Sequence, residues 1–329
     1  MGPYRHAKVR RIFKLVLSLL ALPAAANGPH SDISYEEHSA RQQKYYLPES
    51  SMHNGERYIA YIDAGPVTGA PILLIHGVPN SSWSYRHLIE LLSEKGFRVI
   101  APDNYGFGNS SKLTKSEELT FESQAVRTFG LMDSLGIDRW TQVLHDVGGP
   151  ISWEMLLKDP ERIERLVILN TFAYEAGWHP PAAMGNTLVQ FALGAIGFRN
   201  REIIRTTVCN MIAVPEELDN EKALEGYYLP LESGADRAYL SFMGSFAAVR
   251  SRLPNYHAAL RRNRPPSIII WGALDDSLVG EEAIPRFVSD LSIRDADIHV
   301  VGDAKHLVME EAPRYLADTI AEFVLRSGN

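Results

Sequence analysis

The sequence contains almost no cysteine and no long hydrophobic run. Cys209 is the single cysteine among 329 residues, so an internal disulfide framework and a cysteine-based metal cluster are excluded. Basic residues are fewer than acidic ones: 33 Lys and Arg stand against 40 Asp and Glu, which gives a formal net charge of −7. That balance argues against a protein that chiefly binds phosphate backbones. We therefore expect no nucleic-acid partner, and no motif indicates a metal or a cofactor.

The composition is otherwise that of a soluble globular protein. Apolar residues make up 45% of the chain and charged residues 22%, which is close to the average for this class and excludes a disordered or low-complexity chain. The length suffices for one large α/β domain or two ordinary domains.

The first 26 residues contain no acidic side chain. Five Lys and Arg residues precede an apolar stretch, Leu15–Leu22, and small residues lead up to Ala26. This pattern predicts a secretory signal peptide, cleaved near Ala26, and hence an exported protein, periplasmic or secreted. The apolar stretch is well short of the roughly 20 residues that span a bilayer, so we expect no stable membrane anchor after cleavage.

The basic part of this leader leaves the export route open. Arg10 and Arg11 resemble a twin-arginine signal, but an ordinary basic leader explains them equally well. Cleavage would remove five positive charges and take the formal charge from −7 to −12.

Beyond the leader, short apolar runs alternate with amphipathic helical segments. Runs such as 72–75, 166–169 and 268–271 are typical of strands buried on both faces of a parallel sheet. The alternation predicts an α/β fold with a doubly wound, mostly parallel sheet.

The alternation stops for roughly 90 residues, which is too long for a structureless loop. We expect a helical cap there, inserted after the strand at 165–170, where α/β sheets bind ligands. The predicted organisation is a signal peptide (1–26), an N-terminal lead-in (27–54), a core (55–171 and 265–329) and a helical cap (172–264).

Asp146 follows a buried strand and precedes Gly148 and Gly149, which would allow a sharp turn into a helix. This is the context of a nucleophile elbow, although on this segment alone Asp146 could equally cap the helix. The backbone N–H groups of Val78 and Val147 could then form an oxyanion hole.

Two further segments follow late strands. Asp275 and Asp276 lie at the carboxyl end of the strand that includes 268–271, and His306 lies at the start of the last predicted helix. The order nucleophile, acid, histidine is that of the α/β-hydrolase triad. In contrast, Glu310 and Glu311 are interpreted as solvated charges in the first turn of that helix.

These motifs resemble the α/β-hydrolase superfamily over residues 55–325, in the subgroup of haloalkane dehalogenases and epoxide hydrolases. His76-Gly77-Val78-Pro79 is similar to the family's HGxP turn, and an aspartate in the elbow is specific for the subgroup. The resemblance implies that Asp146 attacks a saturated carbon of a small apolar organic substrate and forms an alkyl-enzyme ester.

The resemblance also assigns the second step. His306 would activate the water that hydrolyses the ester, with Asp275 as its acid partner and Asp276 as the runner-up. A ligand-binding protein on a hydrolase scaffold remains a further alternative.

The leaving group depends on side chains around the nucleophile. Dehalogenases of this subgroup resemble one another in a Trp after the nucleophile, where this chain has Val147, although Trp83 or Trp178 could substitute. Epoxide hydrolases resemble one another in cap tyrosines. The resemblance favours epoxide opening, with dehalogenation as the alternative, and the candidate proton donors are Tyr227, Tyr228, Tyr239 and Tyr256.

Overall fold

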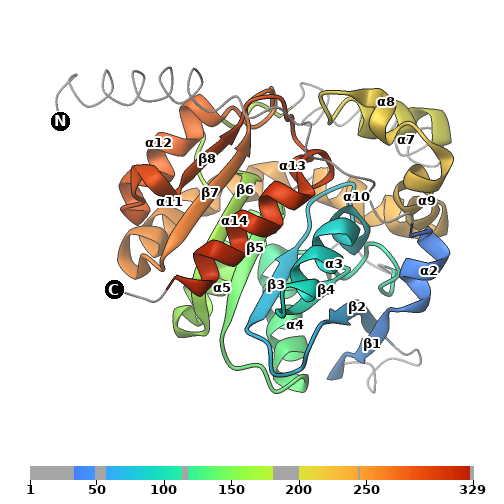
Figure 1. The fold of residues 1–329 in the computed structure, drawn as a ribbon, viewed down its shortest axis with the longest axis horizontal. Coiled ribbons are helices and arrows are strands. Elements are labelled where there is room, and N and C mark those ends of the chain that lie inside the picture. The colour runs from blue at the N-terminus through green and yellow to red at the C-terminus, as the bar shows by residue number, and fades with distance from the viewer. Residues whose placement is uncertain (1–32, 49–56, 113–117, 181–199, 244, 327–329) are drawn as a thin grey trace.

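The computed structural model shows a sheet covered by helices on both faces (Figure 1). The predicted signal peptide, with both arginines of the export motif, lies outside the described residues. The residues that the structure describes are 33–48, 57–112, 118–180, 200–243 and 245–326.

Within these described ranges, eight strands form one continuous sheet. They are β1 (Gln43–Tyr46), β2 (Tyr58–Ala64), β3 (Pro71–Ile75), β4 (Arg98–Pro102), β5 (Trp140–Asp146), β6 (Ile163–Thr171), β7 (Ser267–Gly272) and β8 (Ile298–Val301). Their order is β1-β2-β4-β3-β5-β6-β7-β8. β2 pairs antiparallel with both of its neighbours, and all the other pairs are parallel. The predicted mostly parallel sheet is confirmed.

The helices of the described residues include those that cover both faces of this sheet and those of the insertion after β6. They are α2 (Tyr35–Ala40), α3 (Arg86–Glu94), α4 (Phe121–Ser134), α5 (Gly148–Lys158), α7 (Arg201–Cys209), α8 (Pro215–Leu218), α9 (Glu221–Pro230), α10 (Asp236–Met243), α11 (Phe246–Asn263), α12 (Gly280–Leu291), α13 (Val308–Glu311) and α14 (Pro313–Leu325). Short 3₁₀ turns are η2 (Ser82–Tyr85), η4 (Pro160–Arg162) and η6 (Asp295–Asp297), and η5 (Leu231–Ala235) is a π turn. α3 packs with α14 on one face, and α5 packs with α4 and α11 on the other (Figure 1).

Local sequence explains where these helices begin and which side they bury. Thr120 and Ser123 form a reciprocal capping box at the start of α4, which satisfies backbone N–H groups that the first turn leaves without partners. In α3, Leu88, Ile89 and Leu92 are buried, and their spacing places them on one helical face. That face packs against the sheet.

The insertion after β6 supplies α7 to α10. The loop after α7 reaches the segment that follows β8, because the carbonyl of Met211 accepts hydrogen bonds from the N–H groups of His306 and Leu307, at 2.9 and 3.1 Å. The cap therefore contacts the histidine loop directly.

Two elements make contacts across the predicted boundaries. α11 lies within the predicted cap, 172–264, but it packs against α5 and α12, so by its contacts it belongs to the helical layer on the sheet. At the other end, β1 lies within the predicted lead-in, 27–54, and pairs with β2. The position of α11 depends on helix packing and that of β1 on strand pairing. Both involve residues far apart in the sequence, so local periodicity does not predict them.

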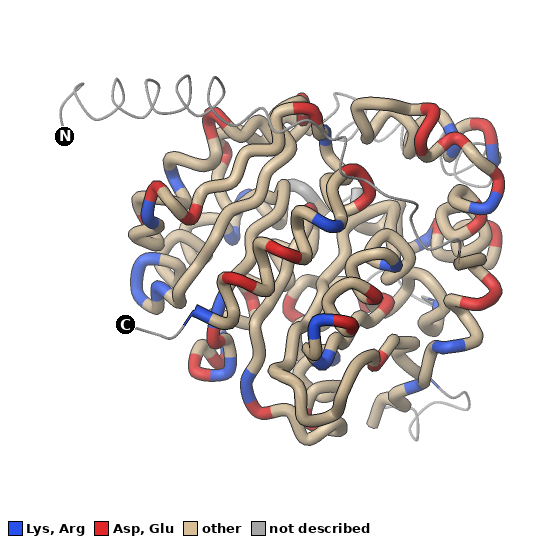
Figure 2. Tube along the Cα trace, in the orientation of Figure 1, with Lys and Arg blue, Asp and Glu red and all other residues tan. Residues whose placement is uncertain are grey.

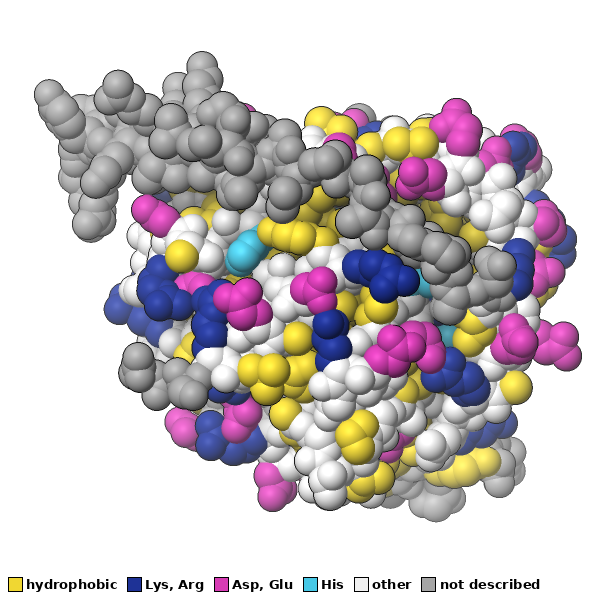
Figure 3. All heavy atoms as spheres, in the orientation of Figure 1, with side chains coloured by type: hydrophobic (Ala, Val, Ile, Leu, Met, Phe, Trp, Pro, Cys, Tyr) yellow, Lys and Arg dark blue, Asp and Glu magenta, His cyan; other side chains and the backbone are white. Residues whose placement is uncertain are grey.

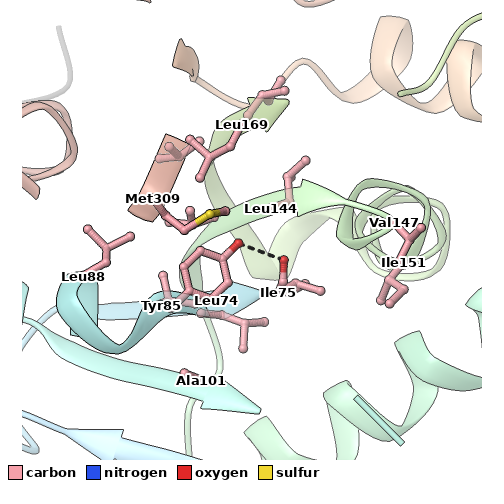
Figure 4. Packing of buried hydrophobic residues seen from close by; sticks show 14 of the residues in the cluster. Leu74, Ile75, Tyr85, Leu88, Ala101, Leu144, Val147, Ile151, Leu169 and Met309 are labelled. Carbon is pink, nitrogen blue, oxygen red and sulfur yellow. Dashed lines mark hydrogen bonds between the residues drawn. The ribbon is translucent and has the colours of Figure 1, made fainter. Parts of the chain in front are cut away.

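Buried side chains hold the carboxyl end of β3 in place (Figure 4). The Tyr85 hydroxyl donates to the carbonyl of Ile75 at 3.1 Å, and the Tyr85 side chain is fully buried. Leu88 and Met309 lie beside Tyr85 in this cluster. The turn that follows β3 therefore starts from a fixed position.

Charged side chains of both signs are interspersed along the chain and over the face drawn (Figures 2 and 3). Within the part of the chain that the structure describes, no helix has the length and apolar character to cross a membrane. The same residues contain no group of three or more His, Cys, Asp and Glu side chains arranged to hold a metal ion.

Candidate active site

The chain turns sharply at Asp146, between β5 and α5. Asp146 has a positive φ of 51°, a left-handed conformation that costs a non-glycine residue roughly 1–2 kcal/mol and that Asp tolerates better than most. The neighbouring glycines are required by space: a Cβ on Gly77 would lie 2.4 Å from the Cβ of Asp146, and one on Gly148 would lie 2.3 Å from the carbonyl oxygen of Ile75. The turn places Asp146 at the carboxyl end of β5, a central strand of the sheet.

Backbone N–H groups bind this carboxylate. The N–H of Val78 donates to Asp146 Oδ1 at 2.9 Å, and the N–H of Val147 also hydrogen-bonds the carboxylate. The other oxygen, Oδ2, faces His306 Nε2 at 3.9 Å. The two carboxylate oxygens are therefore in different environments, one held by the backbone and the other turned toward the imidazole.

His306 is bonded through its second ring nitrogen to Asp275, at 2.7 Å between Nδ1 and Oδ2. The N–H groups of Ser277 and Leu278 donate to Asp275 Oδ1 at 2.9 and 3.0 Å, which fixes that carboxylate. Asp276 has an 80% exposed side chain whose ion-pair partner is Lys305, at 3.9 Å. The structure thus brings Asp275, and not Asp276, to the histidine.

Burial and charge shift the pKa values of all three groups. Burial alone would lower the pKa of His306, but the carboxylates of Asp275 and Asp146 raise it to about 9. Burial opposes ionisation of Asp275 too, yet His306 and the surrounding donors hold the pKa of Asp275 at about 2. For Asp146, burial raises the pKa, against the influence of His306 and the two backbone donors. The imidazolium form is therefore stabilised between two carboxylates.

A small cavity opens in front of Asp146 and His306. Its volume is about 110 Å³, and most of its wall is apolar. Among the side chains that line it are those of Val147, Phe172, Trp178, Tyr239, Phe242 and Leu278. Cap and core thus contribute to the same cavity.

Tyr239 is the one of the four predicted cap tyrosines that lines this cavity. Its side chain is buried, and burial together with the charge of Asp146 raises the pKa of its hydroxyl. Tyr239 therefore keeps its proton beside the carboxylate.

The other three tyrosines use their hydroxyl groups elsewhere. Tyr227 donates to Glu310 at 2.5 Å and Tyr256 to Glu154 at 2.8 Å. Tyr228 donates to Glu221 within the cap. The structure does not bring any of these three hydroxyl groups to the Asp146 cavity, because each is bonded to a glutamate outside it.

The two candidate tryptophans, Trp83 and Trp178, lie in different places relative to the Asp146 cavity. The indole N–H of Trp83 donates to the carbonyl of Ala223 at 2.9 Å, and Trp83 is absent from the lining of the Asp146 cavity. Trp178 lines that cavity and stacks on Phe172, with ring centroids 4.5 Å apart and planes at 5°. Only Trp178, of this pair, is placed to contact a ligand there.

Sequence analysis missed two residues at the end of β6. Asn170 donates to Asp275 Oδ2 at 2.8 Å, and the Thr171 hydroxyl donates to the carbonyl of Asp146 at 2.5 Å. The available signal was a polar pair that directly follows a buried apolar strand, at the edge of the sheet where the other site residues lie.

The interpretation of Glu310 and Glu311 as solvated charges is wrong, because both side chains are buried. Glu310 accepts hydrogen bonds from Arg86 and Tyr227. Glu311 accepts from the backbone N–H groups of Ala213 and Lys305, at 2.6 and 2.7 Å. Partners from α3, from the cap and from the histidine loop compensate the cost of burying these carboxyl groups.

Comparisons with known proteins agree with this architecture. A family model described as alpha/beta hydrolase fold matches residues 70–313. The chain is 28% identical to the uncharacterized hydrolase YugF of Bacillus subtilis (strain 168), over 77% of this chain and 89% of that protein. It is 29% identical to haloalkane dehalogenase 2 of Mycobacterium tuberculosis (strain ATCC 25618 / H37Rv), over 80% and 90%. The solved structure of the epoxide hydrolase CorEH without ligand superimposes with a TM-score of 0.62 at 23% identity, over 86% of this chain and 98% of that one.

Proposed function

Because this chain belongs to the α/β-hydrolase family and is a hydrolase, we propose that it hydrolyses epoxides through a covalent ester on Asp146. A carboxylate is ionised without help from a base, so it can attack a saturated carbon directly. The substrate is a small, mainly apolar organic molecule, in keeping with the lining of the cavity.

In the first step, Asp146 Oδ2 attacks a ring carbon of the epoxide. A bond forms between this oxygen and the carbon, and the bond from that carbon to the ring oxygen breaks. Tyr239 gives its proton to the ring oxygen as the oxygen gains negative charge. A hydroxyl that stays protonated next to Asp146 is a suitable donor for this transfer.

In the second step, His306 takes a proton from water, and the water oxygen attacks the Asp146 ester carbonyl. Negative charge develops on Oδ1, to which the N–H of Val78 already donates, and the N–H of Val147 also hydrogen-bonds this carboxylate. Each such donor is worth on the order of 3 kcal/mol in a tetrahedral transition state. The ester bond to Oδ2 then breaks, His306 gives this proton to the leaving oxygen, and the diol departs. The proton that stays on the Asp146 carboxyl group passes to the tyrosinate of Tyr239, so that both groups return to their starting states.

Esterification also prepares the base for this second step. The charge on Asp146 is one cause of the raised pKa of His306, and the ester carries no charge. The pKa of His306 therefore falls once the ester forms, which increases the neutral fraction that can accept a proton.

The observation that carries epoxide opening is the presence of Tyr239 in the Asp146 cavity, opposite a nucleophile that is followed by Val147. A phenolic hydroxyl can protonate an alkoxide, and valine offers no side-chain donor to a halide. Dehalogenation is the second candidate, since Trp178 lines the same cavity and a dehalogenase is among the relatives.

The test is to incubate the His306→Gln variant with one panel of epoxides and one of haloalkanes and to measure intact mass. Epoxide hydrolysis requires an adduct from the epoxide panel that maps to Asp146, and Asp146→Asn in the same background must form none. An adduct from haloalkanes alone would favour the second candidate. Absence of an adduct from both panels, in a folded protein, would contradict the nucleophilic role of Asp146.

A further inference from the structure

A second cavity adjoins the one at Asp146. Its volume is about 240 Å³, and it lies between the start of α4, the first turns of α5, and α11. Val147 and Phe242 line both cavities. These two side chains therefore form the partition between them.

The Asp146 cavity alone restricts what can react there. Its volume of about 110 Å³ is below the ~150 Å³ of an engineered protein cavity that accommodates benzene. An epoxide with a substituent as large as a phenyl ring does not fit in this space. Such a substrate extends beyond this cavity, and the adjoining cavity across Val147 and Phe242 offers the space for it.

The first turn of α5 leads from one cavity to the other. Val147 and Ile151 are four residues apart on this turn (Figure 4), so their side chains lie on the same face of the helix. Val147 lines both cavities, and Ile151 lines the second alone. A substituent on an epoxide at Asp146 can therefore pass over Val147 and reach Ile151.

The second cavity is suited to an apolar group. Its apolar side chains come from the loop after β4, from α4 and from α11, and include Phe107, Leu119, Phe121 and Val249. Its buried carboxylate, Glu154, is already bonded by Arg252 and Tyr256, so that charge is compensated within the protein. Phe242 packs edge-on against Phe121, with ring centroids 5.6 Å apart.

We propose that this second cavity is the subsite for an apolar arm of the substrate, at least as large as a phenyl ring, and that Phe242 and Val147 set which arms can enter. The inference rests on the proposed epoxide hydrolysis and narrows its substrates to aryl or long-chain alkyl epoxides. The arm lies against Ile151 while the ring carbon faces Asp146.

The first test fills the cavity with an added aromatic ring. Ile151→Phe is expected to lower the ratio of kcat/KM for phenyloxirane over methyloxirane by about tenfold or more, because loss of apolar burial at the arm weakens transition-state binding. Phe242→Ala is expected to raise the same ratio. Val126→Phe, which adds the same ring at an exposed position of α4, is the matched control and should leave the ratio unchanged.

A second variant that fills the cavity keeps the test valid if Ile151→Phe does not fold. Val249→Phe enters the cavity from α11 and should lower the ratio in the same direction. An unchanged ratio in both folded filling variants would overturn the subsite.

A binding measurement separates this inference from the proposed function. The unreactive probe 1-phenylethane-1,2-diol should bind the wild-type chain. Ile151→Phe should raise the Kd of this probe by about tenfold, again through lost apolar contact. Binding that depends on Ile151, without turnover of either oxirane, would support the subsite and contradict epoxide hydrolysis. Probe affinity that is equal in the wild type and in both filling variants would overturn the subsite.

Discussion

His306 lies between two carboxylates but hydrogen-bonds only one of them, with Nε2 standing 3.9 Å from Asp146 Oδ2 and Nδ1 2.7 Å from Asp275 Oδ2. The longer distance exceeds a hydrogen bond. The charge of the imidazolium still favours an ionised Asp146, while Oδ2 is not tied to the base. A nucleophile and a base that act in successive steps need this arrangement.

The two neighbouring acids of the loop after β7 should differ strongly in effect. Asp275→Asn replaces the carboxylate at His306 Nδ1 by a neutral amide and removes the largest influence that raises the pKa of His306, so ester hydrolysis should slow by roughly 10⁴-fold, as in other triads that lose this carboxylate. Asp276→Asn should lose far less, because its side chain is largely exposed. Single-turnover kinetics measure both. Equal losses would contradict the assignment of Asp275.

Tyr239→Phe should slow formation of the Asp146 ester from epoxides by about 10²-fold or more, the usual contribution of a general acid. Tyr228→Phe removes a hydroxyl that donates to Glu221 in the cap and serves as the control. The rate of adduct formation, followed by mass in the His306→Gln background, is the readout. An undiminished rate in Tyr239→Phe would remove this residue from the mechanism.

Local sequence was sufficient for the buried parallel strands β3, β6 and β7 and for the sharp turn at Asp146, because apolar runs and adjacent glycines are short-range signals. It did not indicate β1, whose place in the sheet depends on pairing with β2. It was insufficient for the cap. Tyr227 and Tyr239 have equivalent local patterns, and only the packing of α9 and α10 directs one hydroxyl to Glu310 and brings the other to Asp146. The burial of Glu311 likewise depends on Ala213, 98 residues away.

The His306 pair should make stability depend on pH in a defined window. The pKa of His306 is raised from about 6.5 in an unfolded chain to about 9. Its contribution is therefore fully present below about pH 6.5 and is lost as the pH rises through about 9. For Asp275, with a pKa lowered to about 2, the contribution is present above the ordinary value and is lost as the pH falls through about 2.

Urea unfolding checks this window for the histidine. Between about pH 6.5 and pH 9.5 the wild type should lose more free energy of unfolding than His306→Gln, because only the wild type releases this proton. Identical slopes for the two proteins would show that His306 does not titrate in this range.

Glu311 should be a stabilising residue although its carboxyl group is buried, and burial raises the pKa of that group to about 7. Glu311→Ala leaves the N–H groups of Ala213 and Lys305 without this acceptor, and because both donors are partly buried the cost should be about 1 kcal/mol for each, at the low end of the range for an unsatisfied donor. Glu281→Ala, at an exposed first-turn position of α12, is the control and should change stability by less than about 0.5 kcal/mol. Denaturant unfolding compares the two, and equal effects would refute the bridging role.

The leader should be removed on export near Ala26. Expression of the full chain in a bacterial host, followed by intact mass of the exported protein, should give a product that has lost about the first 26 residues. Replacing Arg10 and Arg11 together by lysine keeps the charge and should block export only if the twin-arginine route is used. Exported protein of full mass would contradict a cleaved signal.

The left-handed backbone at Asp146 sets reactivity against stability at a single position. Any residue with a Cβ carries strain there, and glycine, which is free of it, has no carboxylate. A laboratory selection for folding stability alone would therefore enrich glycine at position 146. The resulting protein would be more stable and would have no hydrolase activity. The nucleophile persists in such a lineage only under direct pressure for turnover.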